Sequence, residues 1–251
     1  LDKNLPLNDY PRPQLRRNSF INLNGEWNYA IYDEYKKFAG YQGKITVPFS
    51  PECLLSGVER MVEPTDVLYY QKIFDFKRTN HRVLLHFGAV DYECTVTLNN
   101  SVVGEHKGGY LPFTFDVTQY ILDGENDLRL AVKDPTDTSY HARGKQTFKR
   151  GGIWYTPQSG IWQTVWLEEV CEGYIESIKL TPDIDADELR VEINYNGKAT
   201  DEMAAIALDN GEVMAGTKLV DGKGVIKLTD YECWSPENPN GTYPVSYTHL
   251  R

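Results

Sequence analysis

The chain has 251 residues, of which 41% are hydrophobic and 25% charged, and its formal net charge is -10 at neutral pH. This composition, with a mean hydropathy of -0.49, is typical of a folded globular protein and argues against disorder. An acidic chain without a stripe of Lys and Arg argues against a nucleic-acid partner, because duplex binding needs a basic footprint. No apolar run approaches the roughly 20 residues of a membrane-spanning helix, so no membrane partner is expected.

The first two thirds of the chain have the alternating pattern of β-strands. Apolar and polar residues alternate in short runs separated by Asn-Gly, Gly-Gly and Asp-Gly turn signals, and long helical stripes are missing. Only residues 51–56 suggest a helical turn. Many short, evenly spaced strands predict an antiparallel sandwich, a jelly roll over residues 1–172. The expected strands are 26–32, 44–47, 67–76, 82–89, 93–98, 113–117, 127–132 and 162–170.

A second strand-rich block follows residue 173. Five alternating segments, 174–180, 188–195, 202–208, 212–219 and 224–228, are separated by further turn signals. They are similar to the first part of an immunoglobulin-like sandwich, which normally has about seven strands in roughly 100 residues. We therefore expect residues 173–244 to form an incomplete immunoglobulin-like domain, and the whole chain to be all-β.

The last residues have the pattern of a foreign tail. Residues 245–251, VSYTHLR, fit one reading frame of a common transposon-based sequencing adapter. We expect this segment to derive from the adapter, and such tails are excluded from reasoning about a fold. A gene whose nucleotide sequence at these codons differs from the adapter would contradict the expectation.

Residue types that ligate metals are scattered along the sequence. The four cysteines contain no C-x-x-C pair, which favours isolated thiols over zinc or a redox dithiol, and the five histidines lack metal-ligand spacing. Asp134 and Asp137 offer two carboxylates to a cation, but two acids in a short turn more often stabilise the turn. We therefore expect no metal and no cofactor.

The cellular compartment stays open. Residues 1–20 lack the apolar core of a secretory signal peptide, which favours the cytoplasm. The sequence begins at Leu1, however, so a missing leader is an alternative expectation.

An ordered set of motifs resembles the N-terminal region of glycoside hydrolase family 2, the family of β-galactosidases, β-glucuronidases and β-mannosidases. Each motif is weak alone, but their order and spacing cover residues 20–170 almost continuously. A further motif of the family, WSPENP at 234–239, lies in the second block. The motifs of the first block are LNGEW at 23–27, LYYQKIF at 68–74, FGAVDY at 87–92, LNN at 98–100, VGEH at 103–106, PFTFDVT at 112–118, EN at 125–126 and SGIWQTVWLE at 159–168.

The resemblance implies a division of labour between domains. Family members have a galactose-binding-like jelly roll, then an immunoglobulin-like domain, then a (β/α)8 barrel whose two glutamates carry out hydrolysis with retention. A barrel takes about 250 residues, and fewer than 80 follow Gly173, so we expect no catalytic residue in this chain. The expected function is that of an inactive N-terminal fragment of a β-glycosidase, with carbohydrate and the missing barrel as its partners.

The resemblance also implies where this fragment could meet a sugar. In some relatives, loops of the jelly roll reach the sugar pocket, and the matching places here are residues 63–66 and 134–158. The second is richer in suitable groups, since sugar recognition uses flat aromatic faces with fixed polar groups. Loop structure or packing between domains is the alternative. The candidate substrate-binding residues are Asp137, Arg143, Gln146, Trp154 and Tyr155.

Residues 150–168 contain three tryptophans, and each could either contact a ligand or be buried in the core. Trp154 occupies the position at which some relatives carry an acidic residue. This difference argues against a direct transfer of that residue's sugar-binding role to this chain. Alternation places Trp162 and Trp166 on one face of a strand whose two faces are both apolar. We therefore expect these two to be structural and Trp154 to be the one available to a sugar.

A function of another class fits the same features. Jelly rolls also serve as lectins, and a fold alone never fixes function. The alternative is therefore a stand-alone carbohydrate-binding or adhesive β-sandwich protein. The downstream nucleotide sequence separates the two readings, because an open frame that continues into a barrel supports the hydrolase and a genuine stop codon supports the binding protein.

Overall fold

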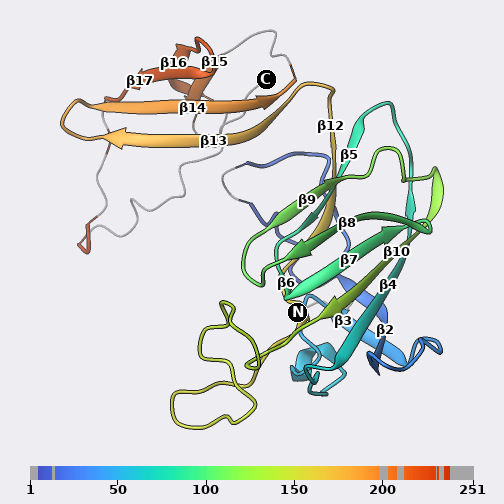
Figure 1. Cartoon of the computed structure of the whole chain (residues 1–251). Helices are drawn as coiled ribbons and strands as arrows, with labels where there is room; N and C mark the ends of the chain where they lie inside the picture. Colours follow the sequence, from blue (N-terminus) through green and yellow to red (C-terminus); the bar gives the residue numbers. More distant parts are fainter. Residues whose placement is uncertain are drawn as a thin grey trace. The chain divides into compact units, whose positions relative to one another are not determined.

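The structure, a computed structural model, describes residues 5–12, 15–197, 203–207, 212–229, 231 and 235–237. The expected adapter tail at 245–251 lies outside these residues, as do Cys233 and Trp234. Strands make up the regular structure, with one short 3-10 helix, η1, at Leu54–Ser56 inside the expected helical turn (Figure 1). The all-β prediction is confirmed.

The chain divides into two compact units. Unit 1 comprises Leu1–Asp9 and Ser19–Glu169, and unit 2 comprises Tyr10–Asn18 and Val170–Arg251. The boundary in the second half of the chain therefore lies three residues before Gly173, where the sequence predicts a new domain.

Unit 1 contains two larger sheets and a small one. A six-stranded sheet has the order β3-β2-β4-β10-β7-β8, a four-stranded sheet has the order β1-β12-β5-β9, and β11 pairs with β6. The bounds of the six-stranded sheet are β3 Gly43–Val47, β2 Gly25–Asp33, β4 Asp66–Phe76, β10 Gly124–Lys133, β7 Glu93–Leu98 and β8 Ser101–Lys107. The others are β1 Ile21–Asn22, β12 Val165–Val170, β5 Arg82–Phe87, β9 Phe113–Asp116, β11 Gly160–Ile161 and β6 Val90–Asp91.

Alternation along these strands explains how the sheets enclose one core. In β10, every second residue from Asn126 to Val132 is buried, and the residues between them are more exposed. Both larger sheets contribute to the same apolar cluster, so unit 1 is a β-sandwich. At the centre of this cluster the rings of Trp27 and Tyr70 meet edge to face at 6.2 Å, and the indole nitrogen of Trp27 donates to the Leu23 carbonyl at 2.8 Å.

The strand expected over residues 162–170 is interrupted. The structure has β11 at Gly160–Ile161 and β12 at Val165–Val170, with residues 162–164 outside any strand. Ile161 and Val165 both reach the core, but Gln163 between them is exposed. A continuous strand was therefore the wrong prediction, because the polar Gln163 and Thr164 mark a break that the apolar alternation conceals.

Unit 2 has a smaller core. Its sheets are β13-β14-β17, with bounds Tyr174–Asp183, Glu188–Asn196 and Lys223–Lys227, and β15-β16, with bounds Met203–Ala207 and Val213–Lys218. Among its described residues, the apolar core cluster comprises Val191, Ile193, Ala204, Leu219 and Ile226. Arg17 belongs to this unit, since it donates to the Ile175 carbonyl at 2.5 Å and lies over the Tyr174 ring.

Candidate functional site

The segment between β10 and β11 is a long irregular loop, and its two ends are fastened together. Figure 1 shows it as an olive-coloured stretch of coil that leaves the end of β10. The buried Asp134 accepts the backbone N–H of Thr136 and the hydroxyl of Ser159, each at 2.7 Å. One carboxylate therefore joins the start of the segment to its end, as a turn-stabilising acid does.

Two of the predicted site residues brace the interior of this segment. Asp137 accepts the Thr147 hydroxyl at 2.6 Å and the backbone N–H of Phe148 at 3.2 Å. The Thr147 hydrogen bond is the main cause that lowers the pKa of Asp137. Gln146 accepts the N–H of Gln158 at 2.6 Å and donates to the Tyr110 hydroxyl at 3.2 Å. Asp137 and Gln146 therefore hold the loop in shape.

A tight turn presents the aromatic residues at the tip. Gly151 and Trp154 exchange backbone hydrogen bonds at 3.2 and 3.1 Å, and Gly152 between them has a φ of +59°, which glycine adopts readily. Tyr155 continues the pairing through its N–H to the Lys145 carbonyl at 2.9 Å. The side chains of Trp154 and Tyr155 remain 44% and 64% exposed. The turn thus holds two aromatic rings at the surface.

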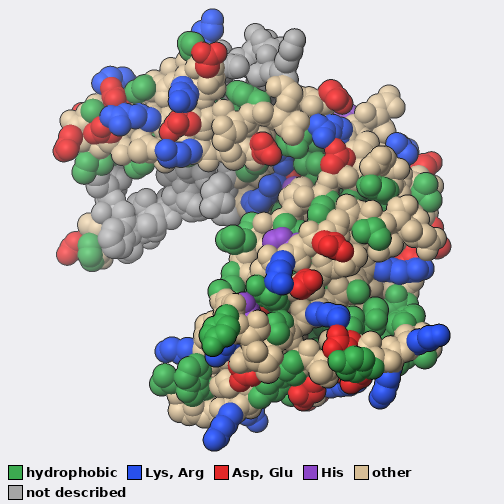
Figure 2. Space-filling view, viewed as in Figure 1, with side chains coloured by type: hydrophobic (Ala, Val, Ile, Leu, Met, Phe, Trp, Pro, Cys, Tyr) green, Lys and Arg blue, Asp and Glu red, His purple; other side chains and the backbone are tan. Residues whose placement is uncertain are grey.

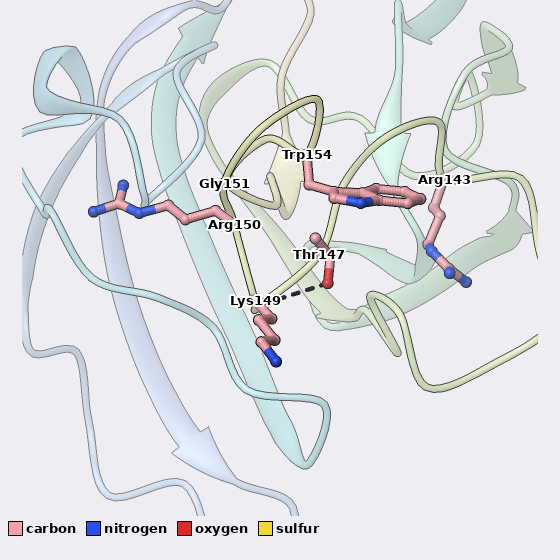
Figure 3. Close-up of a pocket in the computed structure, with 6 residues that line it drawn as sticks. All are labelled: Arg143, Thr147, Lys149, Arg150, Gly151 and Trp154. Carbon is pink, nitrogen blue, oxygen red and sulfur yellow. Dashed lines mark hydrogen bonds between the residues drawn. The ribbon is translucent and has the colours of Figure 1, made fainter.

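An open groove of about 510 Å³ lies beside this turn (Figure 3). Its lining is Arg143, Thr147, Lys149, Arg150, Gly151 and Trp154. Of the five predicted site residues, Arg143 and Trp154 line the groove. Asp137 does not line it but accepts a hydrogen bond from the lining residue Thr147. Gln146 and Tyr155 are not among its lining residues. Sequence reasoning missed Lys149 and Arg150 as site residues, although the basic run that contains them was the available signal.

Buried carboxyl groups lie near the anchored ends of the segment. Glu52 accepts the N–H groups of Val62 and Ser159 at 3.3 and 3.2 Å, and burial raises its pKa to about 7. The side chain of Asp91, in β6, is also buried. Its pKa is raised to about 7, first by burial and then by the charge of Asp134. These acids come from three distant parts of the sequence, so no motif revealed the cluster.

The raised pKa of Asp91 predicts a pH-dependent stability. Its folded pKa lies above the unfolded value near 4, so its contribution is full below about pH 4 and is lost as pH rises to about 7. Relative to the wild type, Asp91→Asn should gain about 4 kcal/mol in unfolding free energy between pH 4 and pH 8. Urea unfolding at a series of pH values measures this difference. The exposed Asp75→Asn is the control, and parallel curves for both variants would contradict the prediction.

The other expected loop is a structural turn. Asp66, at the start of β4, is buried and accepts the N–H of Glu63 at 3.0 Å. Its carboxylate also lies 3.7 Å from the guanidinium of Arg60. The Asp66 carboxylate is thus engaged by the residues of its own loop.

The two remaining tryptophans of this region differ in burial. Trp166 is 2% exposed, stacks on His86 with ring centres 4.8 Å apart, and donates to Glu168 at 3.1 Å. Its prediction as a buried structural residue is confirmed. Trp162 is only half-buried and lies outside the main apolar cluster, with its indole N–H donating to the Gly109 carbonyl at 2.8 Å.

The described residues also set limits on metal and membrane sites. Among them, no cluster of three His, Cys, Asp or Glu side chains has an arrangement that could hold a metal ion. Within the same residues, no helix has the length and apolarity needed to span a membrane. Cys53, Cys94 and Cys171 are free thiols.

Comparison with known proteins identifies the first unit. Residues 51–168 match the model of the glycosyl hydrolases family 2 sugar binding domain. A β-galactosidase of Thermoanaerobacter pseudethanolicus is 29% identical over 215 residues, which are 82% of this chain and 27% of that protein. A putative β-glucuronidase of Formosa agariphila is 28% identical over 56% of this chain and 15% of its own length. This chain therefore spans about a quarter or less of these relatives.

Solved structures agree on the fold. A β-glucuronidase of Bifidobacterium dentium, solved with coumarin-3-O-glucuronide, has a TM-score of 0.69 at 21% identity. The match covers 88% of this chain and 44% of that one. A β-glucuronidase of Faecalibacterium prausnitzii has a TM-score of 0.66 at 21% identity, over 90% of this chain and 43% of its own. Residues 51–168 therefore match the sugar binding domain of the glycosyl hydrolases family 2, and the chain is similar in sequence to β-galactosidases and β-glucuronidases.

Proposed function

We propose that this chain is the non-catalytic N-terminal part of a β-glycosidase, in which residues 134–158 take part in sugar recognition. The observation that carries the proposal is the family 2 sugar binding domain over residues 51–168, which contains this whole segment. The names of the relatives, β-galactosidase and β-glucuronidase, support hydrolysis of a β-linked sugar by the whole protein. Retaining glycosidases place two carboxyl groups about 5 to 5.5 Å apart, and we assign that pair to a barrel outside this chain.

The domain organisation forms part of the proposal. We assign residues 1–172 to a jelly-roll domain, residues 173–244 to an incomplete immunoglobulin-like domain and residues 245–251 to an adapter-derived tail. The sandwich core of unit 1 and the five strands of unit 2 support the first two assignments.

The geometry of the segment supports a recognition role over a catalytic one. Its two acids are engaged, Asp134 with Thr136 and Ser159, and Asp137 with Thr147 and Phe148. The exposed indole of Trp154 offers a flat face to the apolar side of a pyranose ring. Among the proposed residues, Trp154, Tyr155 and Arg143 would contact the sugar, while Asp137 and Gln146 hold the loop that carries them.

Titration of the chain with sugars tests this role. We expect galactose, glucuronate or mannose to change the tryptophan fluorescence in the millimolar range, and Trp154→Ala to abolish the change, because a stacked ring makes the main contact. Isothermal titration calorimetry on the same variant separates lost binding from a lost reporter.

Tyr140→Ala is the matched control. Tyr140 is a fully exposed aromatic residue of the same segment that does not line the groove. The proposed site is wrong if no sugar binds, or if Trp154→Ala and Tyr140→Ala weaken binding equally.

A further inference from the structure

The segment is locally basic in an acidic protein. Residues 134–158 contain four Lys and Arg residues against two acids, while the whole chain has a net charge of -10. Both acids are used inside the segment, as hydrogen-bond acceptors for its own backbone and hydroxyl groups. The lower left of Figure 2, where Figure 1 places the segment, shows Lys and Arg side chains beside hydrophobic ones. The surplus positive charge is therefore available to a ligand.

The cations gather at the groove, and two of them have unused donors. Arg143, Lys149 and Arg150 all line it, and none of the six lining residues is acidic. Arg143 donates through one terminal nitrogen to the Ser139 carbonyl at 3.4 Å, and its buried Nε has no hydrogen-bond partner among the described residues. The Nζ of Lys149 pairs with none of the described residues. Arg150 is partly engaged, since it donates to the Thr156 hydroxyl at 3.2 Å.

The arrangement of these groups fits one class of ligand. Figure 3 shows the Trp154 indole lying above Thr147, with Arg143 beyond one end of the ring and Lys149 on the far side of Thr147. An indole face suits the apolar side of a pyranose, and a guanidinium suits a carboxylate or sulfate, which it can hold through two parallel hydrogen bonds. A neutral sugar would leave Lys149 without a counter-charge, whereas Arg143 also interacts with the charge of Asp137.

We propose that this groove binds an acidic sugar residue, with the ring against Trp154 and a carboxylate or sulfate group held by Arg143 and Lys149. The inference rests on the proposed role of this segment in sugar recognition, and it adds the charge of the ligand. Because the groove is open, the interaction weakens as salt screens the charges.

Calorimetric titration of the chain with four probes tests the inference. Glucuronate carries a carboxylate, glucose 6-sulfate carries a sulfate, glucose is neutral, and inorganic sulfate lacks the ring. At about 20 mM salt we expect at least one acidic sugar to bind about tenfold or more tightly than glucose and inorganic sulfate, as charge-assisted hydrogen bonds allow. Preference for glucuronate identifies a carboxylate ligand, and preference for glucose 6-sulfate identifies a sulfate ligand.

Charge variants provide the second readout. The double variant Arg143→Gln/Lys149→Gln should lose this preference, while Lys145→Gln, which removes a charge from the same segment outside the groove, should keep it. The inference is overturned if glucose binds as tightly as the acidic sugars, if inorganic sulfate alone matches them, or if the double variant keeps the preference. Equal binding of glucose would leave the proposed sugar site standing. Absence of binding by every sugar would remove both proposals.

Discussion

Replacing Glu168 by Ala is expected to lower the unfolding free energy of unit 1 by about 3–5 kcal/mol, because it removes one partner from a buried polar cluster. Glu168 is fully buried, its Oε2 lies 3.2 Å from the Nε2 of His86, and its Oε1 accepts the indole N–H of Trp166. The His86 ring is further fixed by the Thr114 hydroxyl, 2.7 Å from its Nδ1. Removal of the carboxylate takes the acceptor from the buried Trp166 N–H and the oxygen that faces the His86 ring.

Urea unfolding of the two adjacent variants measures this effect. Glu169→Ala is the matched control, because Glu169 bonds the Thr79 hydroxyl at an exposed site and should cost less than about 1 kcal/mol. Glu168→Gln should fall between the two, since an amide oxygen still accepts from Trp166. Equal stabilities of Glu168→Ala and Glu169→Ala would show that the buried cluster contributes nothing.

Gly160→Ala is expected to destabilise unit 1 by about 2–5 kcal/mol, through backbone strain and a steric clash together. Gly160 has a φ of +78°, and a Cβ there would lie 2.1 Å from the hydroxyl of Tyr70 and 2.7 Å from Leu68. Tyr70 is fully buried, and its hydroxyl accepts the N–H of Ile161 at 3.2 Å, so it has little room to move.

Two further variants separate the clash from the strain. Gly124 has a φ of +95°, and no atom lies within 4 Å of a Cβ added there. The Gly124→Ala variant should therefore show the backbone strain alone. Adding Tyr70→Phe to Gly160→Ala removes the clashing oxygen and should recover part of the loss, which a double-mutant cycle by urea unfolding measures. A Gly160→Ala cost no larger than that of Gly124→Ala would contradict the steric part of the argument.

Much of the fold of unit 1 could be predicted from the sequence, because buried and more exposed residues alternate along strands such as β10. Other elements carry no such signal. β8, Ser101–Lys107, was not predicted as a strand, since it lies at a sheet edge, buries no side chain fully and contains Gly104. The break at residues 162–164 was missed because Trp162 and Trp166 continue the alternation across it.

The candidate site was predictable in its residue types more than in its contacts. The exposed aromatic Trp154 and the cationic Arg143 line the groove, as their chemistry suggested. Asp137 and Gln146 have equally suitable groups, but the loop folds so that these groups bond to Thr147 and Gln158. Sequence alone does not decide whether a polar side chain serves a ligand or its own loop, because that depends on backbone groups brought close only by folding.

Hydrolysis assays on two proteins test most directly the claim that this chain recognises sugar while the chemistry lies elsewhere. The purified 251-residue chain and the full-length product of its gene are compared on chromogenic β-galactoside, β-glucuronide and β-mannoside. We predict steady turnover of at least one substrate by the full-length protein and none above the buffer rate by the chain alone. Steady turnover by the pure chain, or a full-length product that binds sugars and hydrolyses none of them, would contradict the account.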